Sequence, residues 1–240
     1  MASSFLQDLM TQLGIRPEKP FDPAVFSDPL AQKTSWQPLQ KGGINFCSHG
    51  LRQKDSLFLE FKTTLVMKIF CSFFILFGLF FSFLPVAVTM GRNHSFPVFL
   101  LGHVLFGLIF AGVGAGILYR AEQPIVFDKR RGMFCKGRGT SNASPGLRNC
   151  TDLARIRGLQ ILSEYCRGNK SSYYSYELNL VLDDASRVNV VDHGDLKRLR
   201  KDALVLGEFL GVPVWDMQLA GQQAAVSAPR EDDWSSLRER

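Results

Sequence analysis

Charged side chains are missing from two long segments of this 240-residue chain. No charged residue occurs between Ile69 and Val88, and between Phe96 and Tyr119 only His103 can carry a charge near neutral pH. Each segment reaches the roughly 20 apolar residues that a helix needs to cross a bilayer core. The pattern excludes a wholly soluble enzyme and a wholly disordered chain, and it predicts a membrane protein with a substantial part outside the lipid.

The sequence also lacks the motifs of common nucleotide and metal sites: it has no P-loop, GxGxxG, HExxH or EF-hand pattern. The five cysteines, Cys47, Cys71, Cys135, Cys150 and Cys166, are odd in number and form no CxxC pair. We therefore expect free thiols in a reducing compartment, with no cofactor and no metal. The 28 Lys and Arg and 22 Asp and Glu are spread along the chain, which argues against a nucleic-acid partner.

Two transmembrane helices are expected at Leu65–Val88 and Phe96–Tyr119, as an antiparallel hairpin within residues 63–120. The first is expected to stay as an anchor, because it begins too far along the chain for a cleaved signal peptide. Its connection to the second carries one basic residue, Arg92, whereas the two flanks carry ten: Arg52, Lys54, Lys62, Lys68, Arg120, Lys129, Arg130, Arg131, Lys136 and Arg138. Since cytoplasmic flanks carry the excess of Lys and Arg, both termini are predicted to be cytoplasmic.

The second span is rich in glycine, including Gly107, Gly112 and Gly116. Small residues let helix backbones approach closely, so we expect these glycines to pack against the first span. Homo-oligomerisation through them and a pore lining are the alternatives. His103 is a candidate functional group because ionisable residues are costly inside a membrane, although a neutral imidazole bonded across the hairpin is the simpler interpretation.

Residues 121–216 show strand patterns followed by one amphipathic helix. Asp195 is expected to cap this helix and Gly211 to end it. Strands are expected at 124–128, 133–135, 156–166, 173–182 and 187–192. About five antiparallel strands closed by a C-terminal helix is the element order of a small pleckstrin-homology-like (PH-like) domain. The predicted fold class is thus a transmembrane α-helical hairpin plus a small α+β domain.

The clearest β-hairpin joins residues 173–182 to 187–192. Period-two alternation places Leu180 and Leu182 on its buried face. The expected register puts Leu182 opposite Val188 and Asp183 opposite Arg187. The other face carries a polar group that is a candidate partner-binding face, or else the solvated side of a half-buried sheet: Glu177, Asn179, Arg187 and Asn189.

Basic residues near the spans are candidates for contact with anionic lipid. The turn Lys129, Arg130 and Arg131 is the preferred candidate, because it follows the second span by ten residues. The helix cations are the weaker candidates, because charges on a helix usually form a solvated face: Lys197, Arg198, Arg200 and Lys201.

The segment Asp192–Asp195 places His193 beside carboxylates, as acid–base catalysis requires. No nucleophile motif accompanies it, and turn and cap roles account for its residues. We therefore predict no catalytic residue.

The remaining regions give weaker signals. Residues 1–40 contain a short amphipathic stripe from Phe5 to Leu13 and a proline-rich linker. Within 41–62, two short strands are expected at Ile44–Cys47 and Leu57–Phe61. They are expected to join the sheet that follows residue 124, because both flanks lie on the same side of the membrane. Residues 217–240 are predicted to be a disordered tail.

Four segments around the hairpin carry a family resemblance: Trp36–Gly43, Tyr176–Leu182, Asp192–Gly194 and Leu210–Asp216. With them the chain resembles uncharacterised bacterial two-span inner-membrane proteins with a cytoplasmic PH-like domain, over residues 36–216. The resemblance implies no catalytic residue and no cofactor. Proteins of this plan are similar to accessory subunits of membrane complexes and to immunity proteins against membrane-acting toxins. We therefore expect a non-enzymatic membrane protein that binds a partner protein through its β-domain or its hairpin, with an immunity protein and a transporter or channel subunit as alternatives.

Overall fold

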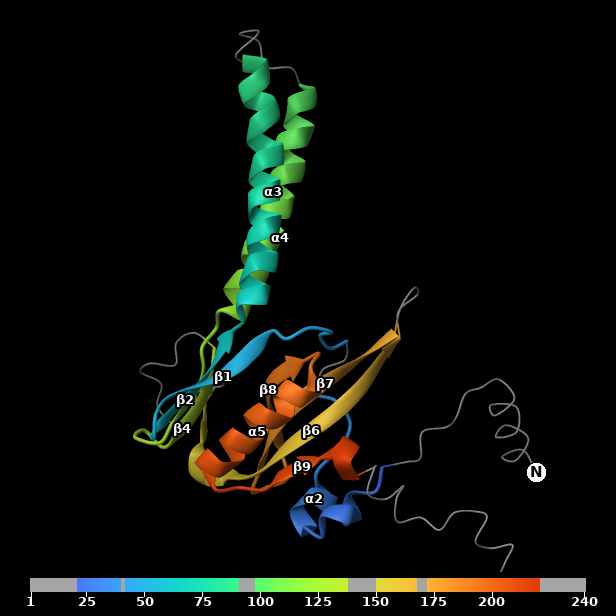
Figure 1. Ribbon diagram of the computed structural model, residues 1–240, viewed down its shortest axis with the longest axis vertical. Coiled ribbons are helices and arrows are strands. Elements are labelled where there is room, and N and C mark those ends of the chain that lie inside the picture. The colour runs from blue at the N-terminus through green and yellow to red at the C-terminus, as the bar shows by residue number, and fades with distance from the viewer. Residues whose placement is uncertain (1–20, 40–41, 91–97, 138–149, 168–171, 221–240) are drawn as a thin grey trace, which may run out of the picture.

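The computed structural model describes residues 21–39, 42–90, 98–137, 150–167 and 172–220. Two long helices, α3 (Leu65–Met90) and α4 (Phe99–Ala121), project together from a β-rich domain (Figure 1). Both are long and apolar enough to cross a membrane, and only 17% of the most apolar window of each is buried within the protein. Length, composition and exposure thus agree with the expected hairpin and support a membrane protein.

Two sheets form the domain. The first has the order β1-β2-β3-β4-β5 and is antiparallel throughout. Its strands are β1 (His49–Asp55), β2 (Phe58–Thr63), β3 (Ile125–Asp128), β4 (Met133–Lys136) and β5 (Cys150–Asp152). The second has the order β8-β7-β6-β9, with β9 parallel to β6. Its strands are β6 (Ile156–Arg167), β7 (Ser172–Leu182), β8 (Arg187–His193) and β9 (Val214–Asp216).

One apolar core joins both sheets to the amphipathic helix α5 (Leu196–Leu210). Leu59 and Phe127 enter it from the first sheet, Leu178 and Leu180 from the second, and Leu206 from α5, all fully buried. The predicted cap and stop of this helix are confirmed. The Asp195 side chain accepts the Arg198 N–H, and Gly211 has the left-handed backbone conformation that glycine adopts at little cost. The five expected strands are present, but they belong to two sheets rather than one.

The hairpin of α3 and α4 is inserted into the first sheet. Strand β2 runs directly into α3, α4 leads into β3, and β2 pairs with β3. This confirms that strands on both sides of the hairpin share a sheet. The position of the first strand was wrong, because β1 is His49–Asp55 rather than Ile44–Cys47. The apolar side chain that suggested the earlier strand, Phe46, instead packs beside Met67 at the foot of α3.

The β7–β8 hairpin has a different register from the one expected. Leu180 lies opposite Val188, and Val181 lies opposite Arg187. The Leu182 N–H donates to the Ser186 carbonyl, and Ala185 has a positive φ of 64°, so the turn falls one residue earlier than the charges suggested. The predicted Asp183–Arg187 pair is replaced by an ion pair from Arg155 to Asp183 and Asp184.

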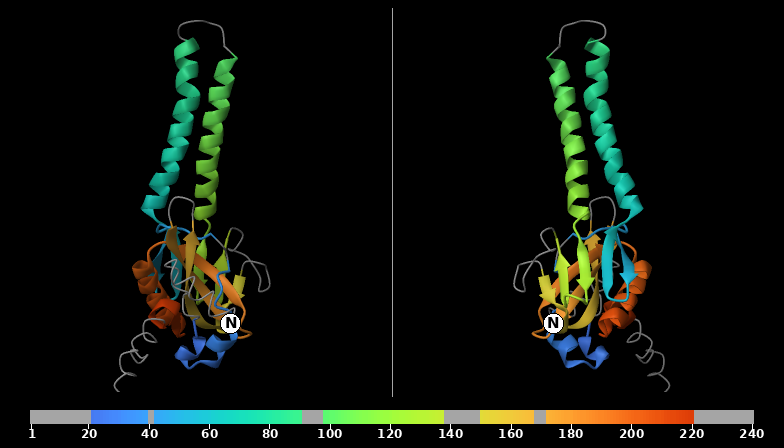
Figure 2. Two further views of the ribbon diagram at one scale, coloured as in Figure 1. Left: turned by 90° about the vertical axis from the view of Figure 1, so that its right-hand side faces the viewer. Right: turned by 90° about the vertical axis from the view of Figure 1, so that its left-hand side faces the viewer.

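Two short helices lie where a linker was expected. They are η1 (Pro23–Phe26) and α2 (Pro29–Lys33), each begun by an aspartate cap and a proline. They pack at the end of the domain opposite to α3 and α4 (Figure 2). The first residues of the expected disordered tail, 217–220, form a helical turn with Ala220 buried. The amphipathic stripe at residues 5–13, the loop with Arg92 and the remainder of the tail lie outside the described residues.

The glycines of α4 point in two directions. A Cβ atom on Gly107 would lie 2.4 Å from the Gly78 carbonyl oxygen of α3, so this glycine is required where the helices touch. Gly112 and Gly116 have nothing within 4 Å of that position. Their expected packing against the first span was therefore wrong, because they lie on a different face of α4 from Gly107.

We predict opposite effects of alanine at two of these glycines. Gly107→Ala should lower the free energy of unfolding by about 1–3 kcal/mol, because the added methyl group forces two backbones apart. Gly112→Ala should leave it unchanged and serves as the matched control. Unfolding of the purified proteins by denaturing detergent gives the comparison, and equal stability of the two variants would contradict the helix contact.

The cysteines do not all remain as thiols. Cys135 and Cys150 lie directly opposite each other on β4 and β5 and form a disulfide, whereas Cys47, Cys71 and Cys166 are free. The expectation of five free thiols was thus wrong, because strand pairing brings together two cysteines that are 15 residues apart. Disulfides persist mainly in oxidising compartments, so this pair argues against the reducing compartment predicted from the cysteine spacing.

Thiol counting tests the disulfide. Protein taken from cells under acid quench and denatured without reductant should alkylate at three cysteines, and at all five after reduction. The Cys135→Ser variant should expose Cys150 as an additional reactive thiol. Five reactive thiols before reduction would show that the pair is reduced in the cell.

Candidate functional site

The polar face of β7 and β8 is covered by another part of the chain. Glu177 and Asn179 are only 5% and 0% exposed. The covering layer is the segment from Thr34 to Leu39, which follows α2 and crosses the second sheet on the side away from the core.

This covering segment is held by side chains that bind its backbone. Both carboxylate oxygens of Glu177 accept the Leu39 N–H, at 3.0 and 3.1 Å. Arg187 donates to the Gln37 carbonyl at 2.7 Å. In addition, Thr34 donates its hydroxyl to the Ala185 carbonyl, Gln160 donates its amide to the Ser35 carbonyl, and the Trp36 ring stacks on Phe26. The candidate partner-binding face is therefore occupied within the chain, and its interpretation as a free surface was wrong.

Asn189 belongs to a neighbouring half-buried network. The Lys136 ammonium group donates to the Asn189 side-chain oxygen at 2.7 Å, and the Asn189 amide donates to Asp192 at 3.0 Å. Burial lowers the pKa of Lys136 and raises that of Asp192, and in each case the charge of the other group opposes the shift. Asn179 is fully buried, and neither atom of its amide has a hydrogen-bond partner within the described part of the chain. Their hydrogen bonds to one another and their burial support a packing role for these groups.

We predict that Glu177 controls how firmly the covering segment is held. Glu177→Ala should speed hydrogen exchange at the Leu39 amide by about tenfold or more, because a bond to a charged acceptor contributes about 1.5–3 kcal/mol. Glu208→Ala, which removes a carboxylate from the exposed face of α5, is the matched control. Unchanged exchange at Leu39 in the Glu177 variant would show that other contacts hold the segment.

His193 and His49 lie where the domain meets the hairpin. His193 donates from Nε2 to the His49 carbonyl and accepts the Asp195 N–H at Nδ1. His49 donates from Nε2 to the carbonyl of Ala121, the last residue of α4. Burial lowers the pKa of both imidazoles, so both favour the neutral form. With both ring nitrogens engaged, His193 has a structural role beside the helix cap.

The Lys129–Arg131 turn lies at the far end of the β3–β4 hairpin from α4 (Figure 1). Arg130 is paired with Asp55 at 2.8 Å, and Lys129 lies over the Phe209 ring at the C-terminal end of α5. The expected lipid contact of Lys129, Arg130 and Arg131 is not supported by this position. Strand β3 runs away from the hairpin, so residues close to the span in sequence are carried away from it in space.

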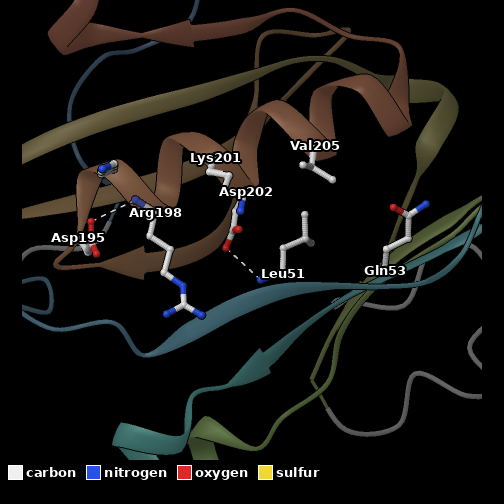
Figure 3. Close-up of a pocket in the computed structure, with 8 residues that line it drawn as sticks. Leu51, Gln53, Asp195, Arg198, Lys201, Asp202 and Val205 are labelled. Atoms are coloured by element: carbon white, nitrogen blue, oxygen red, sulfur yellow. Dashed lines mark hydrogen bonds between the residues drawn. The ribbon is translucent and has the colours of Figure 1, made fainter.

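An open groove lies between α5 and β1, the edge strand of the first sheet (Figure 3). Its volume is about 530 Å³. The Leu51 N–H donates across it to the Asp202 carboxylate at 3.0 Å, and burial raises the pKa of Asp202. The lining residues are Leu51, Gln53, Asp195, Lys197, Arg198, Lys201, Asp202 and Val205. We call this the β1–α5 groove.

Little in the sequence points to this groove. Strand β1 has the polar sequence HGLRQKD, without the alternation that marks a half-buried strand. The charges of α5 look like an ordinary solvated face until β1 is placed beside them. Tertiary contacts determine that β1 becomes the edge strand of the sheet and lies beside the amphipathic helix α5.

Comparisons with protein-family models, curated proteins and solved structures found no match to this chain. The family resemblance, the PH-like fold and the function therefore stand as proposals.

Proposed function

We propose that this chain is a non-enzymatic, membrane-anchored accessory protein that binds an extended segment of a partner protein in the β1–α5 groove. The outer edge of β1 in this groove carries the proposal, because β1 pairs with β2 on its other side. The Leu51 N–H and the His49 carbonyl on this edge are already bonded to Asp202 and His193, so an added strand would pair with the remaining backbone groups. An unpaired edge strand offers backbone hydrogen bonds to an added strand, and pockets beside it select side chains. Leu51 and Val205 supply apolar surface on opposite walls of the groove.

The anchoring supports this role. Helices α3 and α4 join the sheet through short connections, so the groove is held at a defined position relative to the hairpin. The proposal includes a bacterial inner membrane with both termini in the cytoplasm, and the basic flanks favour this orientation. It also includes a PH-like assignment of the domain, which the two sheets and α5 favour. The Cys135–Cys150 disulfide favours the opposite orientation, and reporter fusions at residue 240 distinguish the two.

The alternative functions differ in what they require. An immunity protein would use the same groove with a toxin as the partner, and it should rescue growth when that toxin is expressed. A channel or transporter subunit would need a polar path. His103 lies at a hollow of about 300 Å³ on the hairpin, and the other residues that line this hollow, Phe81, Gly102 and Phe106, offer no polar side chain. The partner-binding role therefore has more support.

Affinity purification of the full-length chain in mild detergent tests the proposal. A stoichiometric partner should accompany the native protein, and Val205→Asp should reduce its recovery at least tenfold, because the new carboxylate would be buried without a partner. Leu219→Asp is the matched control, since Leu219 is also exposed but lies outside the groove. Equal recovery with both variants would place the partner elsewhere, and recovery of the chain alone would contradict the accessory role.

A further inference from the structure

The two ends of the β1–α5 groove differ in charge and in distance from the hairpin. Gln53 and Val205 lie toward one end, and Asp195 and Arg198 lie at the other (Figure 3). The Arg198 end is next to the hairpin, because α5 begins beside the foot of α3. The Gly194 N–H donates to the carbonyl of Phe46, whose ring lies 6.2 Å from that of Phe70 in α3.

The Arg198 side chain of α5 lies against β1 near the end of that strand that is next to the hairpin. Its Nη2 atom would be 2.9 Å from a Cβ atom on Gly50, so the guanidinium group rests on this glycine. Gly50 pairs with Lys62, three residues before α3 begins at Leu65. Three extended residues span at most ~10 Å, and the polar headgroup layer is about 5–7 Å thick. The remaining few ångströms between Gly50 and the headgroup layer are within the reach of the long Arg198 side chain.

The cations at this end outnumber the carboxylates beside them. The Arg200 Nε atom forms an ion pair with Asp216 Oδ2 at 2.6 Å. In the described part of the chain, no such ion pair is formed by Lys197, Arg198 or Lys201. The carboxylates of Asp195 and Asp202 line the same groove, and each also accepts a backbone N–H, from Arg198 and Leu51 respectively. Three exposed basic side chains against two carboxylates leave a net positive charge at the mouth of the groove.

We propose that Arg198, Lys197 and Lys201 bind the phosphate of an anionic phospholipid headgroup at the membrane end of the β1–α5 groove. Guanidinium groups suit phosphate because their N–H donors match its oxygens in pairs. The absence of a side chain at Gly50 allows the guanidinium to lie against β1. This site rests on the proposed membrane insertion of α3 and α4, and it moves the lipid contact from the Lys129–Arg131 turn to α5.

The test is binding of soluble short-chain phosphatidylglycerol to the full-length protein in neutral detergent. Short-chain phosphatidylcholine and inorganic phosphate are the comparison ligands. Arg198→Gln should weaken phosphatidylglycerol binding about fivefold, and the triple change of Lys197, Arg198 and Lys201 to glutamine on the order of a hundredfold, from ~1 kcal/mol for each basic residue. Arg130→Gln, which removes the same charge at the far end of the domain, should have no effect.

A second variant tests the geometry without changing charge. Gly50→Val should displace the Arg198 side chain and weaken phosphatidylglycerol binding, while thermal unfolding shows whether the fold is kept. The lipid site is overturned if Arg198→Gln binds like the native protein, if Arg130→Gln is equally weakened, or if inorganic phosphate binds as tightly as the lipid.

The partner assay on the same samples separates this inference from the proposed function. Val205→Asp should lose the partner and bind the lipid normally, whereas Arg198→Gln should bind the lipid about fivefold more weakly and keep the partner. Loss of the partner with lipid binding intact in Arg198→Gln would assign the basic end to an acidic protein segment and overturn the lipid site. Loss of lipid binding in Arg198→Gln would support the site even if no partner protein is found.

Discussion

The pairing of β2 with β3 is the constraint on which the arrangement of the whole chain depends. Adjacent strands in a sheet lie about 4.8 Å apart, and α3 and α4 continue directly from this pair. The feet of the two helices are thereby set side by side. The Ala121 carbonyl, left unsatisfied at the end of α4, accepts hydrogen bonds from the Thr63 hydroxyl at 2.7 Å and from His49 at 3.0 Å. The hairpin and the domain are thus joined by the sheet and by side chains on both β1 and β2.

This attachment determines which basic residues of the domain lie near the hairpin and which lie at the opposite end. Strand β3 leaves the hairpin and carries Lys129–Arg131 to the far end, where Asp55 and Phe209 bind two of the cations. Helix α5 begins close to the hairpin and runs toward that same far end. Arg198 therefore lies near the foot of α3, although 133 residues of sequence separate it from Leu65. Distance along the chain was a poor guide to distance from the hairpin because successive antiparallel strands reverse direction.

The domain also uses its own N-terminal segment to cover a polar sheet face. Glu177 and Arg187 bind backbone groups of Leu39 and Gln37, as they would bind an extended peptide from another protein. With that face occupied, the β1–α5 groove offers an open concave surface that combines a strand edge with the apolar side chains of Leu51 and Val205. The proposed accessory role and the proposed lipid site use the two ends of this one groove.

The sequence alone determined the elements whose signals are local. Uncharged runs of sufficient length marked α3 and α4, period-two alternation marked β7, and Asp195 and Gly211 marked the ends of α5. Tertiary structure decided which surfaces those elements share. The strand at His49–Asp55, the free face of Gly112, the Cys135–Cys150 pair and the covered side of Glu177 all depend on contacts between distant residues. A polar side chain on a strand has the same sequence signature whether water or another segment covers it, so only the folded chain distinguishes a binding face from an internal contact.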